Sequence, residues 1–496
     1  MDAKQAMDAP TTPLKPLTHK ESRLIVIGAM LPVFIGAMDN TILASALPTI
    51  GRDLDNIRNL PWLITIFLLA STACMPLYGK IADIHGRRVT LCVAIVIHLV
   101  GSLICALAPS MMTLIAGRIV QGIGAAGLTS IPVVVLGDVA APKERGKYSA
   151  YFAVTYTTAG ACGPALGGFL SESLHWSAIF WLNIPLDLLA LSVTWRLLRR
   201  LPRYERPHRL DLIGALLVVA ASVSFMLGLS LTGVRYEWTS APVLSLFVTA
   251  VAVAALFVWR LLAAPEPLIP LAVLRHPIVR WATIANACGW SAIVGLNIFL
   301  PIYLQSVVGL SPTDAGLALI VLMVSLNISA GIGGQVLVRV AHYKVMPIVG
   351  QMVAIGSVIL LALWADRLTM TSFQVLLFLI GAGFGPTPTM AFVTVQNVVE
   401  RHHLGIAYGT MNFSRNLFST ILVAILGALV LAVTASLGGQ AGSGELGGAL
   451  SPGSAEAAAA FRRVFYAVAV CLCISFIAVV MIEQRPLRTD QPGGAA

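Results

Sequence analysis

The residues 89–108, VTLCVAIVIHLVGSLICALA, form a continuous stretch that contains no Asp, Glu, Lys or Arg. An α-helix rises about 1.5 Å per residue, so a helix of about 20 residues crosses a hydrocarbon core about 30 Å thick. The stretch therefore predicts a helix that spans a membrane.

Thirteen further apolar stretches lie on both sides of this one. Charged residues make up 11% of the 496 residues, against about 25% in a typical soluble domain. We therefore expect an all-α membrane protein with fourteen transmembrane helices. Their predicted bounds are 24–48, 60–79, 89–108, 112–136, 148–170, 176–198, 210–231, 241–263, 280–303, 315–338, 344–364, 371–398, 405–436 and 461–482.

The basic residues predict how the chain is oriented. Cytoplasmic loops of membrane proteins carry an excess of Lys and Arg, and most of the 32 basic residues here fall in the two tails and in alternate loops. We expect a multi-pass protein of the cell (inner) membrane with both termini in the cytoplasm. The net charge of +10 follows from this topology, so it does not indicate nucleic-acid binding. The opposite loops carry only Arg52, Arg58, Arg235, Arg367, Arg462 and Arg463.

Two polar regions suggest the domain organisation. Residues 199–209, RRLPRYERPHR, predict a junction after the sixth helix, and the Gly/Ala/Ser-rich residues 437–460 predict a flexible loop. Two six-helix bundles are a common plan for transporters. We expect a tail (1–23), an N-terminal bundle (24–198), the junction (199–209), an inserted helix pair (210–263), a linker (264–279), a C-terminal bundle (280–482) and a tail (483–496).

Enzyme and metal sites are not indicated. All seven cysteines fall within predicted helices, and the nine histidines are scattered along the chain. Neither arrangement favours a disulfide framework or a zinc site. The sequence contains no phosphate-binding P-loop, so ATP is not the expected energy source. We expect no metal, no cofactor and no enzymatic activity.

The loop after the second predicted helix reads GKIADIHGRR at 79–88. Glycines allow a tight reversal, and an Asp and an Arg can form charge-assisted bonds to a neighbouring helix end. The loop resembles the signature loop of the major facilitator superfamily, where such residues lock the outward-open state. The alternative is a basic loop that only sets topology. The resemblance assigns the lock to Gly79, Asp83, Gly86, Arg87 and Arg88, with Asp138 as the acid at the end of the fourth helix.

Three further motifs resemble the fourteen-helix drug:proton antiporter family within that superfamily. They are DNT at 39–41 in the first helix, Arg118 with Gln121 in the fourth, and GPALGG at 163–168 in the fifth. The resemblance implies the major facilitator fold. It also implies that the third motif, with Gly163, Pro164, Gly167 and Gly168, seals the cavity against proton leak; ordinary packing of small residues is the alternative.

Asp39 and Arg118 are the candidate proton-coupling residues. A carboxylate inside the membrane is costly and therefore a candidate functional group. Asp39 lies about 13 Å from the outer end of its helix and Arg118 about 9 Å from the same face, so the two side chains can form a pair. A helix movement that changes their distance could load or release a proton. The alternative is a permanent ion pair that fixes helix packing.

Other polar and aromatic membrane residues are weaker candidates. Asp187 and Arg415 are possible secondary sites. Asp187 either takes part in transport or is solvated at a helix break at Pro185, and Arg415 is either a gate or a packing contact. Predicted helices 9 to 13 contain no central Asp or Glu. The resemblance implies that family members specialised for divalent cations carry additional carboxylates in this half, so a dicationic substrate is not expected. The remaining candidate substrates are monocationic, neutral, zwitterionic or anionic amphipaths. Arg118 and Arg415 would recruit the anionic ones. The candidate cavity residues are Gln121, Asn286, Trp290, Asn297, Phe384, Met390, Phe392 and Gln396.

These features together predict a proton-coupled efflux antiporter that exports amphipathic drugs or toxic compounds by alternating access. A dedicated exporter of one native compound, such as a lipid, siderophore or antibiotic, is the alternative on the same scaffold. The expected partners are the lipid bilayer, small amphipathic substrates and protons. A periplasmic adaptor protein is a possible further partner.

Overall fold

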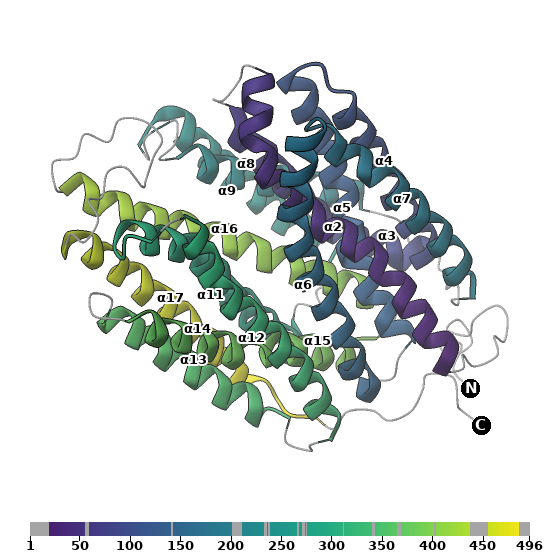
Figure 1. Cartoon of the computed structure of the whole chain (residues 1–496). Helices are drawn as coiled ribbons and strands as arrows, with labels where there is room; N and C mark the ends of the chain where they lie inside the picture. The colour runs from purple at the N-terminus through teal and green to yellow at the C-terminus, as the bar shows by residue number, and fades with distance from the viewer. Residues whose placement is uncertain are drawn as a thin grey trace.

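The computed structural model describes residues 19–54, 59–139, 142–200, 211–232, 239–264, 267–269, 275–310, 312–339, 343–364, 369–400, 403–436 and 455–485, together with residues 236 and 273. This part of the chain is almost entirely α-helical (Figure 1). Most of the predicted junction and most of the predicted loop at 437–460 lie outside the described residues.

The helices follow the predicted order along the chain. They are α2 (His19–Asp53), α3 (Leu60–His85), α4 (Arg87–Ala106), α5 (Met111–Val139), α6 (Pro142–Ser173), α7 (Ala178–Leu197), the short 3-10 helix η2 (Leu198–Arg200), α8 (Leu212–Leu231), α9 (Ala241–Ala263), α11 (Pro277–Ser306), α12 (Pro312–Arg339), α13 (Val345–Leu363), α14 (Met370–Phe384), α15 (Pro386–Val398), α16 (Leu404–Ser436) and α17 (Ala455–Met481).

Several helices are longer than their apolar stretches. α2 begins at His19 and ends at Asp53, beyond the predicted bounds 24–48, because a helix continues into polar residues after the hydrocarbon core ends. The stretch predicted at 371–398 is divided into α14 and α15 at Gly385, just before Pro386. Proline has no amide hydrogen to donate, which favours a break at that point.

Thirteen segments of the described chain are long and apolar enough to cross a membrane. Each coincides with a predicted stretch. The remaining predicted stretch, 148–170, lies in α6, whose residues are more polar than those of the other long helices. α6 packs against α2 and α12, so it lies among the spanning helices (Figure 1).

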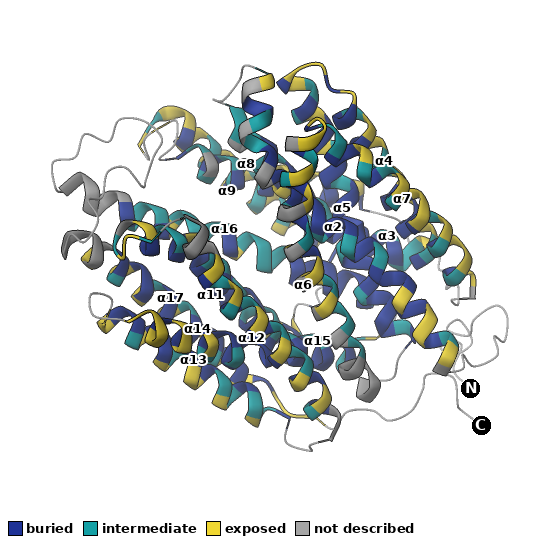
Figure 2. Cartoon of the chain, viewed as in Figure 1, coloured by how far each residue is buried: buried dark blue, intermediate teal, exposed yellow. Residues whose placement is uncertain are grey.

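The opening stretch of the sequence illustrates the two faces of these helices. Within α4, Val93, Val96 and Val100 are exposed, while Leu91 and Ile95 are fully buried. Figure 2 shows such exposed residues on the outer faces of the helices and buried residues on the faces that meet. An apolar outer face is unfavourable in water but suits contact with lipid.

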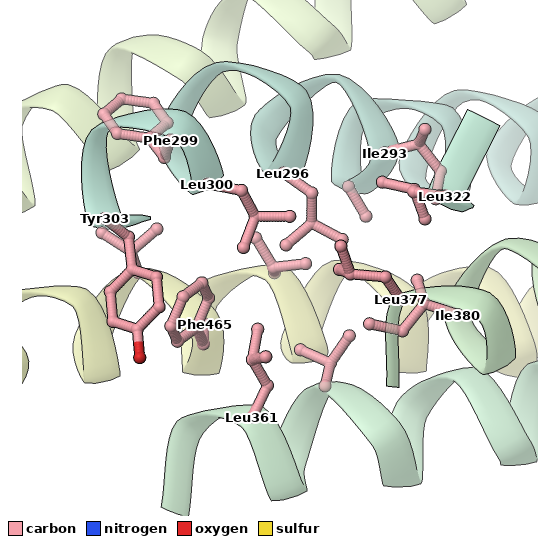
Figure 3. Packing of buried hydrophobic residues seen from close by; sticks show 14 of the residues in the cluster. Ile293, Leu296, Phe299, Leu300, Tyr303, Leu322, Leu361, Leu377, Ile380 and Phe465 are labelled. Atoms are coloured by element: carbon pink, nitrogen blue, oxygen red, sulfur yellow. The ribbon is translucent and has the colours of Figure 1, made fainter. Parts of the chain in front are cut away.

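Two sets of helices have separate apolar cores. α2 to α7, called here the N-terminal bundle, enclose clusters around Ile35 and Ile42. α11 to α17, called the C-terminal bundle, enclose a larger cluster (Figure 3). Its labelled members are Ile293, Leu296, Phe299, Leu300, Tyr303, Leu322, Leu361, Leu377, Ile380 and Phe465.

α8 and α9 pack mainly against each other, and α8 also contacts α3 and α16. The pair therefore lies beside the junction of the two bundles. We propose the division into two six-helix bundles and an inserted pair on this basis. The end of the bundles at which α2 begins is called the inner end below, since the sequence predicts that it faces the cytoplasm.

Candidate functional site

Asp39 and Arg118 form a buried ion pair inside the N-terminal bundle. An Arg118 Nη1 donates to Asp39 Oδ2 at 2.5 Å, and both side chains are almost fully buried. Arg118 Nε also donates to the carbonyl oxygen of Leu63 at 3.2 Å, and the guanidinium lies 4.1 Å from the centre of the Phe67 ring. The pairing expected from helix depth is present, while its role in proton coupling stays a prediction.

Two amides complete the surroundings of the carboxylate. Gln121 Nε2 and Asn183 Nδ2 each donate to Asp39 Oδ1 at 2.9 Å. Gln121 Nε2 also donates to Ser102 Oγ at 2.9 Å. These contacts bring α2, α4, α5 and α7 to one point, and charge-assisted bonds of this kind compensate the cost of burying a carboxylate. Gln121, predicted as a cavity residue, belongs to this cluster.

The inner end of the bundles carries the predicted lock residues in mutual contact. Arg87 Nη1 donates to Asp83 Oδ1 at 2.5 Å, and Arg87 Nε donates to Asp138 Oδ2 at 3.0 Å. The Asp83 carboxylate accepts the backbone N–H groups of Gly405 and Ile406 at 3.2 and 3.0 Å. Asp83 therefore bonds the first turn of α16 in the other bundle, where a negative charge is favourable.

Glycines make this contact possible. Gly86 joins α3 to α4 with φ 85°, a backbone conformation that favours glycine. A Cβ atom at Gly79 would lie 2.3 Å from the carbonyl oxygen of Gly405, so α3 and α16 approach through glycine on both sides. Arg88 points elsewhere, with its guanidinium 3.7 Å from the centre of the Trp195 ring.

Replacement of Asp83 by Asn is expected to weaken the closure of the inner end. A charge-assisted hydrogen bond contributes about 1.5–3 kcal/mol. Its loss is expected to shift the equilibrium between the outward-open and inward-open states by one to two orders of magnitude toward the inward-open state. Distances between spin labels at the inner ends of α3 and α16 would report the shift. His85→Ala is a matched control, because His85 is exposed at the same helix end. An unchanged distance distribution in Asp83→Asn would refute the lock.

The glycine motif of α6 makes a close contact at Gly163 and none at Gly168. A Cβ atom at Gly163 would lie 2.0 Å from Thr41 Oγ1 on α2, whereas one at Gly168 would meet nothing within 4 Å. Thr41 Oγ1 also donates to the carbonyl oxygen of Ala159 at 3.3 Å. Gly167 is buried, and the side chain of Pro164 is not among those described.

A cavity lies between the two bundles, toward the inner end from Asp39. It has a volume of about 170 Å³, below the roughly 300 Å³ typical of drug-sized sites, so the bundles have to separate for such a ligand to enter. Arg415 is the one charged residue among its described lining. The other lining residues are Thr129, Val133, Leu136, Phe152, Tyr156, Trp290, Leu326, Asn327, Ala330, Gly385, Pro388, Thr389, Phe392, Val393, Gln396 and Asn412.

Three of the eight predicted cavity residues, Trp290, Phe392 and Gln396, line this cavity. The other five do not line this cavity in the described structure, and their role in a substrate site stays a prediction. These five are Gln121, Asn286, Asn297, Met390 and Phe384. Asn286 is buried, and its amide has no hydrogen-bond partner among the described residues, whereas the Asn297 amide donates to the Ile293 carbonyl oxygen of its own helix. Met390 lies in an apolar cluster, and Phe384 packs against Gly289.

Asp187 contacts a residue that the sequence did not single out. His98 Nδ1 lies 2.9 Å from Asp187 Oδ2, and both side chains are fully buried. α7 continues through Pro185, and Asp187 contacts His98 instead of being solvated at a helix break there. His98 is the single ionisable side chain near the middle of an otherwise apolar stretch, and that isolation was the available signal.

Comparisons with known proteins agree with this architecture. The sequence matches the Major Facilitator Superfamily over residues 29–211 and 199–424. It is 30% identical over 420 residues to "Multidrug transporter protein MdtP" of Bacillus subtilis (strain 168), covering 84% of this chain and 76% of that protein. It is also 30% identical over 450 residues to "Multidrug resistance protein 3" of the same strain, covering 90% and 86%.

Solved structures share the fold. A bacterial homologue of the iron transporter ferroportin in an outward-facing state gives a TM-score of 0.64 at 13% identity, covering 94% of this chain and 100% of that chain. The human organic anion transporter MFSD10 gives 0.61 at 16% identity, covering 91% and 99%. The paired helical bundles, the contacts of the loop at 79–88 and these similarities together identify the chain as a membrane transporter of the major facilitator superfamily.

Proposed function

We propose that this transporter is a proton-coupled antiporter that exports amphipathic compounds by alternating access to the cavity between its bundles. The buried Asp39–Arg118 pair carries the proposal, because an ionisable pair inside membrane helices is by default a functional site. The bond from Asp83 to α16 supports it, since that contact has to break when the inner end opens. The names of the relatives favour drug-like substrates.

The proposed setting is the cell inner membrane with both termini in the cytoplasm. Protons would then enter from the outer side down their gradient while the substrate leaves in the opposite direction. The distribution of Lys and Arg along the sequence supports this orientation.

Transport by the purified protein in liposomes tests the proposal. An imposed pH gradient is expected to drive the uphill accumulation of a fluorescent amphipath, and a protonophore is expected to abolish it. Accumulation of the amphipath that changes neither with the pH gradient nor with the protonophore would contradict proton coupling. The number of accepted compounds separates a multidrug exporter from an exporter of one native compound, since the second would accept one chemical class only.

Arg415 is expected to set the charge preference of the cavity. Its guanidinium lies 5.1 Å from the centre of the Trp290 ring, and no described carboxylate lines the cavity beside it. Arg415→Gln is expected to weaken binding of an acidic amphipath about tenfold to a hundredfold, and of a neutral analogue much less. Arg415→Lys keeps the charge and serves as the control. Equal losses for both ligands, measured by equilibrium binding, would indicate a packing role.

A further inference from the structure

The His98–Asp187 pair has no part in the function proposed so far. The Nδ1 atom of His98 on α4 lies 2.9 and 3.1 Å from the two carboxylate oxygens of Asp187 on α7. Both side chains have no exposed surface. The other ring nitrogen, Nε2, is buried without a hydrogen-bond partner among the described residues. α4 and α7 lie side by side in the N-terminal bundle (Figure 1).

The pair lies one helical turn from the Asp39 cluster. Ser102, four residues after His98 on α4, accepts a bond from Gln121, and Asn183, four residues before Asp187 on α7, donates to Asp39. One turn corresponds to about 5.4 Å along each helix. α4 begins and α7 ends at the inner side, so His98 and Asp187 lie on the inner side of Asp39. Ser102 Oγ also donates to the backbone carbonyl of His98 at 2.9 Å.

Charge balance links the two sites. Besides Asp187, the charged groups that act on His98 are Asp39 of α2 and Arg118 of α5. Those that act on Asp187 are His98 and Asp39. No charged group of the described parts of α3 or α6 adds to them. With Asp39 and Asp187 ionised, Arg118 charged and His98 neutral, this buried region carries one net negative charge, so binding of a proton at His98 would restore neutrality.

The chemistry of the pair suits reversible proton binding. In the neutral imidazole, Nδ1–H donates to the carboxylate and Nε2 carries a lone pair. A proton therefore adds at Nε2. Binding forms an Nε2–H bond and an imidazolium beside the carboxylate. Release breaks one N–H bond and leaves the neutral ring and the ionised Asp187. No other reactant is needed.

We propose that His98 and Asp187 form a second proton-binding site coupled to Asp39, so that about two protons move in each transport cycle. The inference rests on the proposed proton-coupled export and deepens it. A pair that only fixed the packing of α4 against α7 would affect stability and leave the number of protons unchanged.

The proton-to-substrate ratio of the full chain in liposomes tests the proposal. It is obtained from the pH gradient that just balances a known gradient of the fluorescent amphipath. The parent is expected to give a ratio of about two, and His98→Gln and Asp187→Asn are expected to give about one. Thr194→Val is the control on α7, because its buried hydroxyl has no partner among the described residues. It is expected to keep the parent ratio.

A second measurement does not depend on transport. The ¹⁵N NMR signals of the His98 ring, assigned by their loss in His98→Gln, are expected to change between neutral and protonated forms within the working pH range. Asp39→Asn is expected to move the midpoint of that change. A ring that keeps one protonation state throughout, or a ratio that stays at two without the pair, would overturn the second site. A parent that shows no dependence on the pH gradient would instead refute the proposed function.

Discussion

Replacement of Asp39 by Asn is expected to lower the proton-to-substrate ratio from about two to about one, and so to weaken strongly the uphill export that a pH gradient drives. The carboxylate binds one proton in each cycle, and the amide cannot, so substrate movement at this site is no longer tied to a proton. Downhill exchange is expected to continue, because the amide resembles the protonated acid in shape and charge. Asn183 and Gln121, which both donate to one oxygen of Asp39, can still bond the amide oxygen.

Proton release from the detergent-solubilised protein on substrate addition provides the measurement. Asp39→Asn is expected to release one proton fewer than the parent for each substrate bound. Asp53→Asn is the matched control on the same helix, because its carboxylate is about half exposed and bonds only His175 and Trp176 at the outer end in the described structure. Proton release equal to that of the parent would mean that the carrier lies elsewhere, with Asp187 as the next candidate.

A double variant separates coupling from packing at the same site. Removal of one partner from a buried ion pair leaves an uncompensated charge and costs about 3–5 kcal/mol, whereas replacement of both partners by uncharged groups is often neutral for stability. Asp39→Asn with Arg118→Met is therefore expected to unfold near the temperature of the parent and to keep the lowered proton-to-substrate ratio. Restored uphill transport in this variant would show that the pair has a packing role only.

The fold could be predicted from sequence because apolar length and the positions of Lys and Arg report directly on the bilayer. The prediction of an all-α membrane protein with the major facilitator fold is confirmed. The bounds of α2 and α6 could not be predicted in the same way, since both helices continue into polar residues where hydropathy gives no signal. The break at Gly385 depends on the proline that follows it. Hydropathy summed along the stretch does not detect such a break.

The candidate site could be predicted where a motif fixes both residue type and spacing. The contacts of Asp83 with the first turn of α16, and of Arg87 with Asp138, follow from such a motif. Contacts that depend on helix rotation could not be predicted, because each residue of a membrane helix has a lipid-facing and a protein-facing alternative that one sequence does not distinguish. The contact between His98 and Asp187 depends on helix rotation in this way, and no spacing in the sequence predicts it.

Substitution of Gly163 by Leu is expected to disrupt both exchange and the seal against protons. A Cβ atom at this position would lie 2.0 Å from Thr41 Oγ1 and 3.1 Å from the backbone nitrogen of Ile42, so even the first carbon forces α6 away from α2. Overpacking of this kind typically costs about 1–3 kcal/mol, and a leucine adds three further carbon atoms. Thr41 is two residues from Asp39, so the displacement reaches the ion pair.

Gly168 provides the control for this effect, because it lies on the same helix and a Cβ atom there would meet nothing within 4 Å. Gly168→Leu is expected to unfold at the temperature of the parent and to transport normally, whereas Gly163→Leu is expected to lower the unfolding temperature and to let protons leak through liposomes without substrate. A pH-sensitive dye inside the liposomes measures the leak. Fully coupled transport by a well-expressed Gly163→Leu protein would contradict the seal, because α2 and α6 would then tolerate separation at the level of Asp39.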